Sequence, residues 1–302
     1  MLDSGIKSAA VGGTAGLAVG ALLLNALVWG ISWWPFRELE RHGLHPLWAT
    51  AIIYTISMAC LLLVRPGALG GLLRHPSLWL LAVAAGLSNV GFNWAVTTGD
   101  VVRVVLLFYL MPAWVALLAW PLLGERPGVG SLLRLALALS GLAVVLKTPD
   151  SPWPVPQSAS DWLALMGGFS FALTNILLRR LNHTPGEARI LAMFGGGMVM
   201  AGGVALAGTL MGLIAMPPAP GSSWMGVAAL ISLAFLSGNL ALQYGASRLR
   251  AGTTSLVMVS EVVFASASSV MLGASEVSAR MLVGGGLILV AVLLSACSPQ
   301  SD

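Results

Sequence analysis

The chain has 302 residues, of which 57% are hydrophobic and 9% are charged, and its formal net charge is +4. Soluble domains carry about 25% charged residues, so this composition excludes a water-soluble globular protein. The basic residues are spread along the chain rather than clustered, so the positive charge does not indicate a nucleic-acid-binding protein.

Ten apolar stretches follow one another, and each has about the length of a membrane-spanning helix. A hydrocarbon core of about 30 Å requires about 20 apolar residues per helix. The predicted spans are 15–35, 46–64, 77–98, 101–123, 130–147, 160–180, 188–210, 224–245, 252–273 and 278–297. The first stretch is long and lacks a strongly basic lead-in, so we expect a retained helix rather than a signal peptide. The sequence therefore predicts an all-α, polytopic membrane protein embedded in the lipid bilayer.

The basic residues also predict an orientation. With ten crossings and a cytoplasmic N-terminus, ten of the 15 Lys and Arg residues fall on the cytoplasmic side and five on the far side. Cytoplasmic loops of membrane proteins carry an excess of Lys and Arg. We therefore expect a multi-pass protein of the inner (plasma) membrane with both termini in the cytoplasm.

A proline-rich segment divides the spans into five and five. We expect an N-terminal half at 1–148, a linker at 149–160 with four prolines, and a C-terminal half at 161–302. Asn89 and Asn93 recur 150 residues later as Asn239 and Gln243. Because each half has an odd number of spans, the second half must enter the membrane from the opposite side. The predicted architecture is two inverted five-helix repeats, whose interface is the expected place for a binding site.

Polar and aromatic side chains within the spans are the candidates for contact with a solute. Residues four apart share one helix face, so the amide pairs predict two polar stripes that meet near the repeat axis. Pro112 removes a backbone donor in mid-span and is expected to kink its helix and free the carbonyl of Phe108. The predicted substrate-binding residues are Trp29, Trp33, Asn89, Asn93, Tyr109, Pro112, Trp114, Asn239, Gln243 and Tyr244. The alternatives are interhelical adhesion by the amides and ordinary packing of the aromatic rings.

Glu261 is the carboxylate nearest the middle of any predicted span. Placing an acid there costs about 2.5–3.5 kcal/mol on insertion scales. Two roles stay open. Glu261 either carries a proton or anchors the ammonium group of a solute, or it is structural and bonds Ser260, Thr254 or the backbone of a neighbouring helix.

Several short motifs resemble the EamA-type half of the drug/metabolite transporter superfamily. They are Trp29-Gly30, the run from Phe108 through Pro112 to Leu123-Gly124-Glu125, Ser140-Gly141, Phe171-Ala172 with Arg179-Arg180, and Glu261-Val262. The chain departs from the pattern at Val262, where proline is expected, and at Ala274, where a second Leu-Gly-Glu would place its acid. The tryptophan-rich, ten-helix layout is most similar to the amino-acid exporters of this superfamily. The resemblance implies export of neutral amino acids, aromatic ones among them, through a central cavity by alternating access.

Other functions fit the sequence less well. A nucleotide sugar, a sugar phosphate or a lipophilic compound is the alternative solute, but phosphorylated solutes call for basic side chains in the cavity, and only Arg103 and Arg134 are candidates. His42 and His45 lack the glutamate of a zinc-protease motif, so no metal site is predicted. The sequence has no HExxH or GxSxG motif and no mid-span histidine, so we expect neither an enzyme nor a cofactor.

Overall fold

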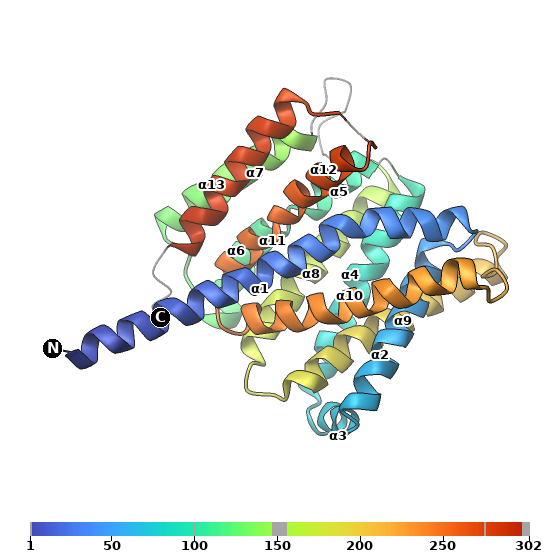
Figure 1. Cartoon of the computed structure of the whole chain (residues 1–302), viewed down its shortest axis with the longest axis horizontal. Helices are drawn as coiled ribbons and strands as arrows, with labels where there is room; N and C mark the ends of the chain where they lie inside the picture. The colour runs from blue at the N-terminus through green and yellow to red at the C-terminus, as the bar shows by residue number, and fades with distance from the viewer. Residues whose placement is uncertain (1, 100, 147–155, 275, 298–302) are drawn as a thin grey trace.

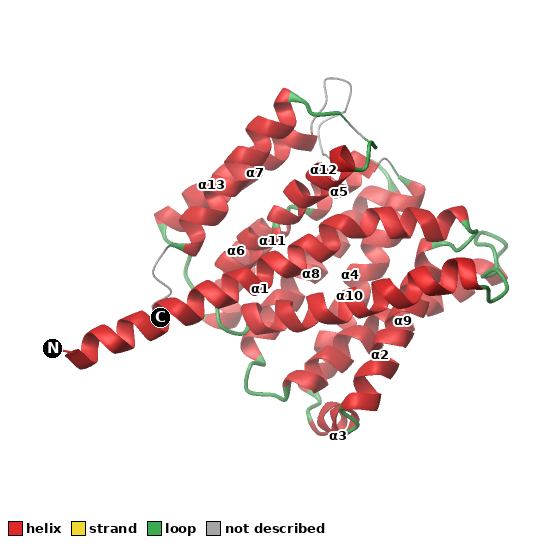
Figure 2. Cartoon of the chain, in the orientation of Figure 1, coloured by secondary structure: helices red, strands yellow, loops and turns green. Residues whose placement is uncertain are grey.

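The computed structural model describes residues 2–99, 101–146, 156–274 and 276–297, and this part of the chain is helical with no strand (Figure 1, Figure 2). The helices are α1 (Leu2–Arg41), α2 (Pro46–Val64), α3 (Gly67–Arg74), α4 (Ser77–Thr98), α5 (Val101–Phe108), α6 (Met111–Leu123), α7 (Val129–Leu146), α8 (Ala159–Arg180), α9 (Gly186–Leu210), α10 (Ser222–Ala246), α11 (Ala251–Met258), α12 (Ser260–Met271) and α13 (Ala279–Ala296). Most of the predicted linker at 149–160 lies outside the described residues.

Ten segments of the described chain are long and apolar enough to cross a membrane, which confirms the predicted number. Their bounds agree with the predicted spans within a few residues, except that the first continues through Pro35 to Arg41. Two spans consist of two helices each, α5 with α6 and α11 with α12. The short helix α3 between the second and third spans was not predicted.

The two broken spans are interrupted at corresponding positions. α5 and α11 each have eight residues, and their bounds differ by 150. In the first half Pro112 explains the break, because it cannot donate to the carbonyl of Phe108, where α5 ends. That carbonyl packs against Gly168 of α8, where any side chain would overlap it. In the second half the break occurs without a proline, and Glu261 lies in the first turn of α12, where the helix dipole favours an acid.

Each half packs its first helix against the other half in the same way. α1 packs against α10 and against α11 and α12, while α8 packs against α4 and against α5 and α6. The fifth spans, α7 and α13, lie side by side at one edge of the molecule (Figure 1). Gly141 and Gly284 bring these two backbones into contact, since a Cβ on either would lie within 2.7 Å of the other's carbonyl oxygen. In lipid, helices associate by van der Waals packing rather than by the hydrophobic effect, and small residues at a crossing allow this close packing.

One corresponding pair of contacts is unequal. α4 packs extensively against α9, whereas α10 and α2 share a much smaller contact. The α4–α9 crossing depends on glycine: a Cβ on Gly196 would overlap the carbonyl of Ala82, and one on Gly86 would lie 2.6 Å from the carbonyl of Gly196. At the thinner crossing, the Ser57 hydroxyl donates to the Ser232 carbonyl at 2.9 Å. The helices therefore close one side of the bundle more tightly than the other.

Candidate functional site

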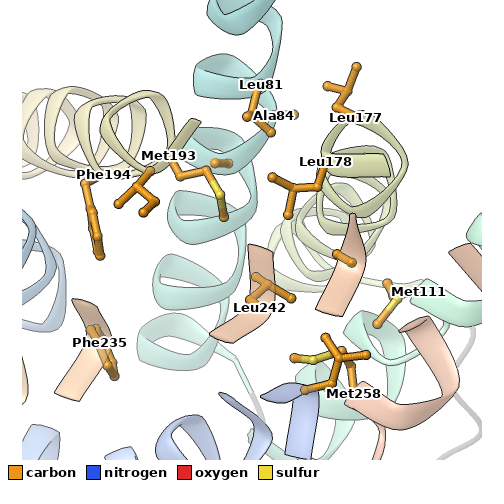
Figure 3. Close-up of a cluster of buried hydrophobic side chains, with 14 of the residues drawn as sticks. Leu81, Ala84, Met111, Leu177, Leu178, Met193, Phe194, Phe235, Leu242 and Met258 are labelled. Carbon is orange, nitrogen blue, oxygen red and sulfur yellow. The ribbon is translucent and has the colours of Figure 1, made fainter. Parts of the chain in front are cut away.

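A cavity lies between the two halves at the level of the helix breaks. The volume within which the centres of water molecules fit is about 70 Å³, so the cavity has room for several waters. Its lining comes from eight helices of both halves: Trp29, Tyr54, Ala85, Ser88, Asn89, Phe92, Asn93, Phe108, Phe171, Thr174, Met193, Asn239, Leu242 and Glu261. Met193 and Leu242 also belong to the buried apolar cluster drawn in Figure 3.

Two groups of packed aromatic rings contribute to the lining. In the first group, Trp29 stacks on Phe235 with ring centroids 4.3 Å apart, and Tyr54 packs edge-on against Phe194 at 5.0 Å. In the second, Phe108 lies between Phe92 at 4.7 Å and Phe171 at 5.8 Å. The first group comes from α1, α2, α9 and α10, and the second from α4, α5 and α8. A flat or apolar side chain entering the cavity therefore meets rings from both halves.

The amides of α4 are satisfied by protein groups. Asn89 accepts a hydrogen bond from the Tyr54 hydroxyl at 2.8 Å and donates to the carbonyl of Ala85 at 2.8 Å. Asn93 donates to the Thr50 hydroxyl at 2.6 Å. Both asparagines also line the cavity. Interhelical adhesion, one of the two predicted roles, is therefore observed for this pair, and contact with a solute stays a prediction.

The amides of α10 are satisfied less well. Asn239 lines the cavity, and its Oδ1 atom is buried with no hydrogen-bond partner in the described chain. Gln243 is buried, and its side-chain N–H donates to the sulfur of Met193 at 4.0 Å, while its Oε1 atom has no hydrogen-bond partner among the described residues. A buried polar group without a partner costs about 1–3 kcal/mol. The two amide stripes that look alike in the sequence therefore have different environments.

Glu261 lines the cavity and is held by a hydrogen bond from the Tyr109 hydroxyl. This contact joins the two broken spans across the interface between the halves, because Tyr109 follows α5 and Glu261 begins α12. Ser260, one of the structural partners considered above, donates instead to the carbonyl of Val257 at 2.7 Å. Glu261 is the acidic side chain among the cavity-lining residues given above, so the charge of the site depends on whether this carboxyl holds a proton.

The remaining candidate residues lie around the cavity rather than in its lining. Trp33 donates to the Ser268 hydroxyl at 2.9 Å, and Pro112 is buried at the start of α6. Trp114 packs edge-on against Phe169 at 5.7 Å, and its indole nitrogen is buried without a partner among the described residues. Tyr244 lies under the guanidinium of Arg248, 3.8 Å from the ring centre.

Several lining residues were not predicted, among them Tyr54, Ser88, Phe92, Phe108, Phe171, Thr174 and Met193. Ser88 and Phe92 lie one residue before Asn89 and Asn93, so the amide stripe marks their face of α4. Phe108 and Phe171 belong to the motifs that carry the family resemblance. Tyr54, Thr174 and Met193 have no comparable signal in a single sequence. In the described chain no three His, Cys, Asp or Glu side chains are placed to hold a metal ion.

Residues 16–147 match the EamA-like transporter family, which covers the five spans of the first half and less than half of the chain. A solved crystal structure has a similar fold, with a TM-score of 0.74 and 18% identity over 92% of this chain and 96% of its own. At that identity the likeness shows the fold alone. No curated protein sequence matches the chain. The ten apolar helices indicate a multi-pass membrane protein, and the first half of the chain is similar to a family of transporters.

Proposed function

We propose that this protein is a membrane transporter that exports neutral amino acids, including aromatic ones, through the central cavity. The observation that carries the proposal is the cavity itself, which lies between the two halves and combines rings, amides and one carboxylate. A neutral amino acid has an ammonium group, a carboxylate and a side chain. Glu261 can pair with the ammonium group, amide N–H and hydroxyl groups of Asn239 and Ser88 can donate to the carboxylate, and the rings can enclose the side chain.

The mechanism we propose is alternating access between two inverted repeats. The equal lengths and 150-residue spacing of α5 and α11 support the repeat, as do the matching contacts of α1 and α8. Discontinuous helices at a repeat interface are typical of carriers that bind near the middle of the bilayer. The α4–α9 contact is tight and the α2–α10 contact is small, as expected for a state that is closed on one side of the membrane and looser on the other. The closed side is the one where α3 meets α9.

The orientation is also part of the proposal. The excess of Lys and Arg in the predicted cytoplasmic loops supports an inner-membrane protein with both termini in the cytoplasm. In that orientation α3 and the α4–α9 crossing face the cytoplasm, so the cavity of this conformation is closed on the cytoplasmic side.

The alternative is a carrier of the same fold for another small metabolite or drug. The aromatic lining suits a lipophilic compound as well as an aromatic amino acid. A nucleotide sugar or sugar phosphate is less suitable, because the described residues that line the cavity include no Arg or Lys. The side chain of Arg103, one of the two candidates for such a role, lies outside the described part, and Arg134 lies elsewhere, as discussed below.

Uptake into proteoliposomes containing the purified protein tests the proposal. Radiolabelled neutral amino acids should accumulate or exchange, with aromatic ones among the substrates, while sugar phosphates should not. Phe171→Ala removes a ring from the cavity and should raise KM for aromatic amino acids. Phe169→Ala, two residues away on the same helix with 39% of its side chain exposed, is the matched control and should leave KM unchanged. Absence of transport for every neutral amino acid would reject this substrate assignment.

A further inference from the structure

A second cavity, apart from the central one, lies where α6, α7 and α11 begin or end. Its volume is about 240 Å³, as the space open to the centres of water molecules, and it is lined by Ala116, Ala119, Glu125, Arg126, Pro127, Gly128, Gly130, Ser131, Arg134, Arg250, Gly252 and Thr253. Three arginines and one carboxylate therefore surround one space. We propose that this cavity binds the phosphate group of a ligand, either an anionic phospholipid headgroup or a free phosphate.

The carboxylate in the cavity is already neutralised. One oxygen of Glu125 lies 3.4 Å from the Arg179 guanidinium. The other lies 3.9 Å from the Arg250 guanidinium and accepts a hydrogen bond from the backbone N–H of Ala251 at 3.0 Å. Glu125 thus caps α11 and is already paired with Arg179 and Arg250. Its negative charge therefore does not neutralise the other arginines of the cavity wall, which stays positive.

Arg126 and Arg134 supply that charge. Neither forms an ion pair with a carboxylate within the described residues. The guanidinium of Arg126 lies over the Trp120 ring, 4.9 Å from its centre. The Nε atom of Arg134 is buried and has no hydrogen-bond partner in the described chain, although it sits six residues into a membrane span. A buried guanidinium donor is costly to leave unpaired, and its planar fork matches the oxygens of a phosphate.

The backbone around the two arginines suits the same ligand. α7 begins at Val129, and Gly128, Gly130 and Ser131 beside its first turn line the cavity. The first N–H groups of a helix have no partner within the helix and carry partial positive charge, so they favour a phosphate. Arg134 reaches back over this turn, since a Cβ on Gly130 would lie 3.6 Å from its Nη1 atom. Arginine side chains and helix amides therefore converge on one space.

The surroundings place the cavity at a membrane surface. Leu117, Val129 and Leu133 on the flanking helices expose 66%, 76% and 66% of their side chains, as lipid-facing residues do. Trp120 is 56% exposed beside Arg126, which is typical of an interfacial aromatic residue. A phospholipid could therefore insert its headgroup from the bilayer, and a free phosphate could enter from the adjacent solvent.

Binding to the purified full-length chain in a phosphate-free, nonionic detergent tests the proposal. Native mass spectrometry would measure binding of phosphatidylglycerol against phosphatidylcholine, and calorimetry would measure binding of inorganic phosphate. We expect one of the two phosphate probes to bind, and Arg134→Gln and Arg126→Gln each to raise its Kd about tenfold or more. Binding of phosphatidylglycerol alone identifies a lipid site, and binding of inorganic phosphate alone identifies a soluble ligand.

Arg74→Gln is the matched control. Arg74 is exposed on α3, which lies on the same side of the membrane by the count of crossings, so this variant removes the same charge outside the cavity. Arg126 is exposed, so Arg126→Gln keeps the test valid if Arg134→Gln does not fold, and Arg134→Lys should retain part of the affinity. The proposal is overturned if neither probe binds the native protein, or if Arg74→Gln weakens binding as much as the cavity variants do.

Discussion

Asn239→Leu separates a role of the α10 amide in transport from a role in folding. The Oδ1 atom of Asn239 is buried without a partner among the described residues. Such a group costs about 1–3 kcal/mol, and leucine has about the size of asparagine without its polar atoms. We therefore expect Asn239→Leu to raise the free energy of unfolding by about 1–2 kcal/mol.

Asn89→Leu is the matched control, since Asn89 lies 150 residues earlier and has both of its hydrogen bonds. The substitution leaves the Tyr54 hydroxyl, which donates to Asn89 at 2.8 Å, without its acceptor. The free energy of unfolding should fall by about 1–3 kcal/mol. Thermal unfolding of the purified variants in one detergent should show opposite shifts of Tm, each of about 2–4 °C per kcal/mol.

Asn239→Leu should impair transport although it stabilises the protein. If Asn239 donates to the carboxylate of the solute, its loss removes a hydrogen bond to a charged group, worth about 1.5–3 kcal/mol. Asn239→Leu should therefore raise KM in proteoliposomes by about 10- to 100-fold while the protein is more stable. A variant that is less stable than the native protein and transports with an unchanged KM would refute this reasoning.

Three further predictions concern the carboxylate, a helix crossing and a helix cap. Glu261→Gln should lower transport at least tenfold and remove any dependence on a pH gradient, because Glu261 is the one acidic residue among the named lining residues. Uptake with and without an imposed gradient measures both effects. Gly196→Ala should force α4 away from α9 and lower the free energy of unfolding by about 1–3 kcal/mol. Gly203→Ala on the same helix has open space at its Cβ, so it should be neutral or stabilising by up to about 1 kcal/mol. Thermal unfolding compares the two variants. Burial lowers the pKa of His45, against the opposing effect of Glu40, and its Nδ1 caps α2. That cap, worth about 1 kcal/mol, should be fully present above the ordinary pKa of 6.5 and should be lost as the pH falls through the lowered pKa of the folded state. His45→Asn should remove this pH dependence. Hydrogen exchange in the first turn of α2 measures the effect.

The helical fold could be predicted because the bilayer leaves few alternatives. Each span must satisfy its own backbone hydrogen bonds and be about 20 residues long, so apolar length alone gives ten membrane spans. Pro112 also marks the break of the fourth span, since its missing N–H is a local property. The corresponding break before Glu261 has no proline and could not be placed from composition. The helix α3 is too short to leave a hydropathy signal.

The site could be predicted only in part, because the signal was polarity within an apolar span. This signal leads to Asn89, Asn93, Asn239 and Glu261, all of which line the cavity. It does not distinguish a lining tryptophan such as Trp29 from Trp33, which bonds a neighbouring helix, because both lie on one face of α1. The apolar and hydroxyl residues of the lining are ordinary membrane residues in sequence. Their position depends on how the helices rotate against each other, which only tertiary packing decides.

The difference between the two amide stripes bears directly on the proposed exchange of states. On the α4 side, Asn89 and Asn93 have partners from α2, and α4 is locked against α9 by glycines. On the α10 side, the side-chain oxygens of Asn239 and Gln243 have no hydrogen-bond partner in the described part of the chain, and α10 meets α2 over a small area. In inverted repeats, the opposite state gives each half the packing that the other half has here. The α2–α10 crossing would then tighten as the α4–α9 crossing loosens, so the two states would have helix contacts of similar extent. A carrier needs that balance, because a strongly preferred state would trap the solute on one side of the membrane.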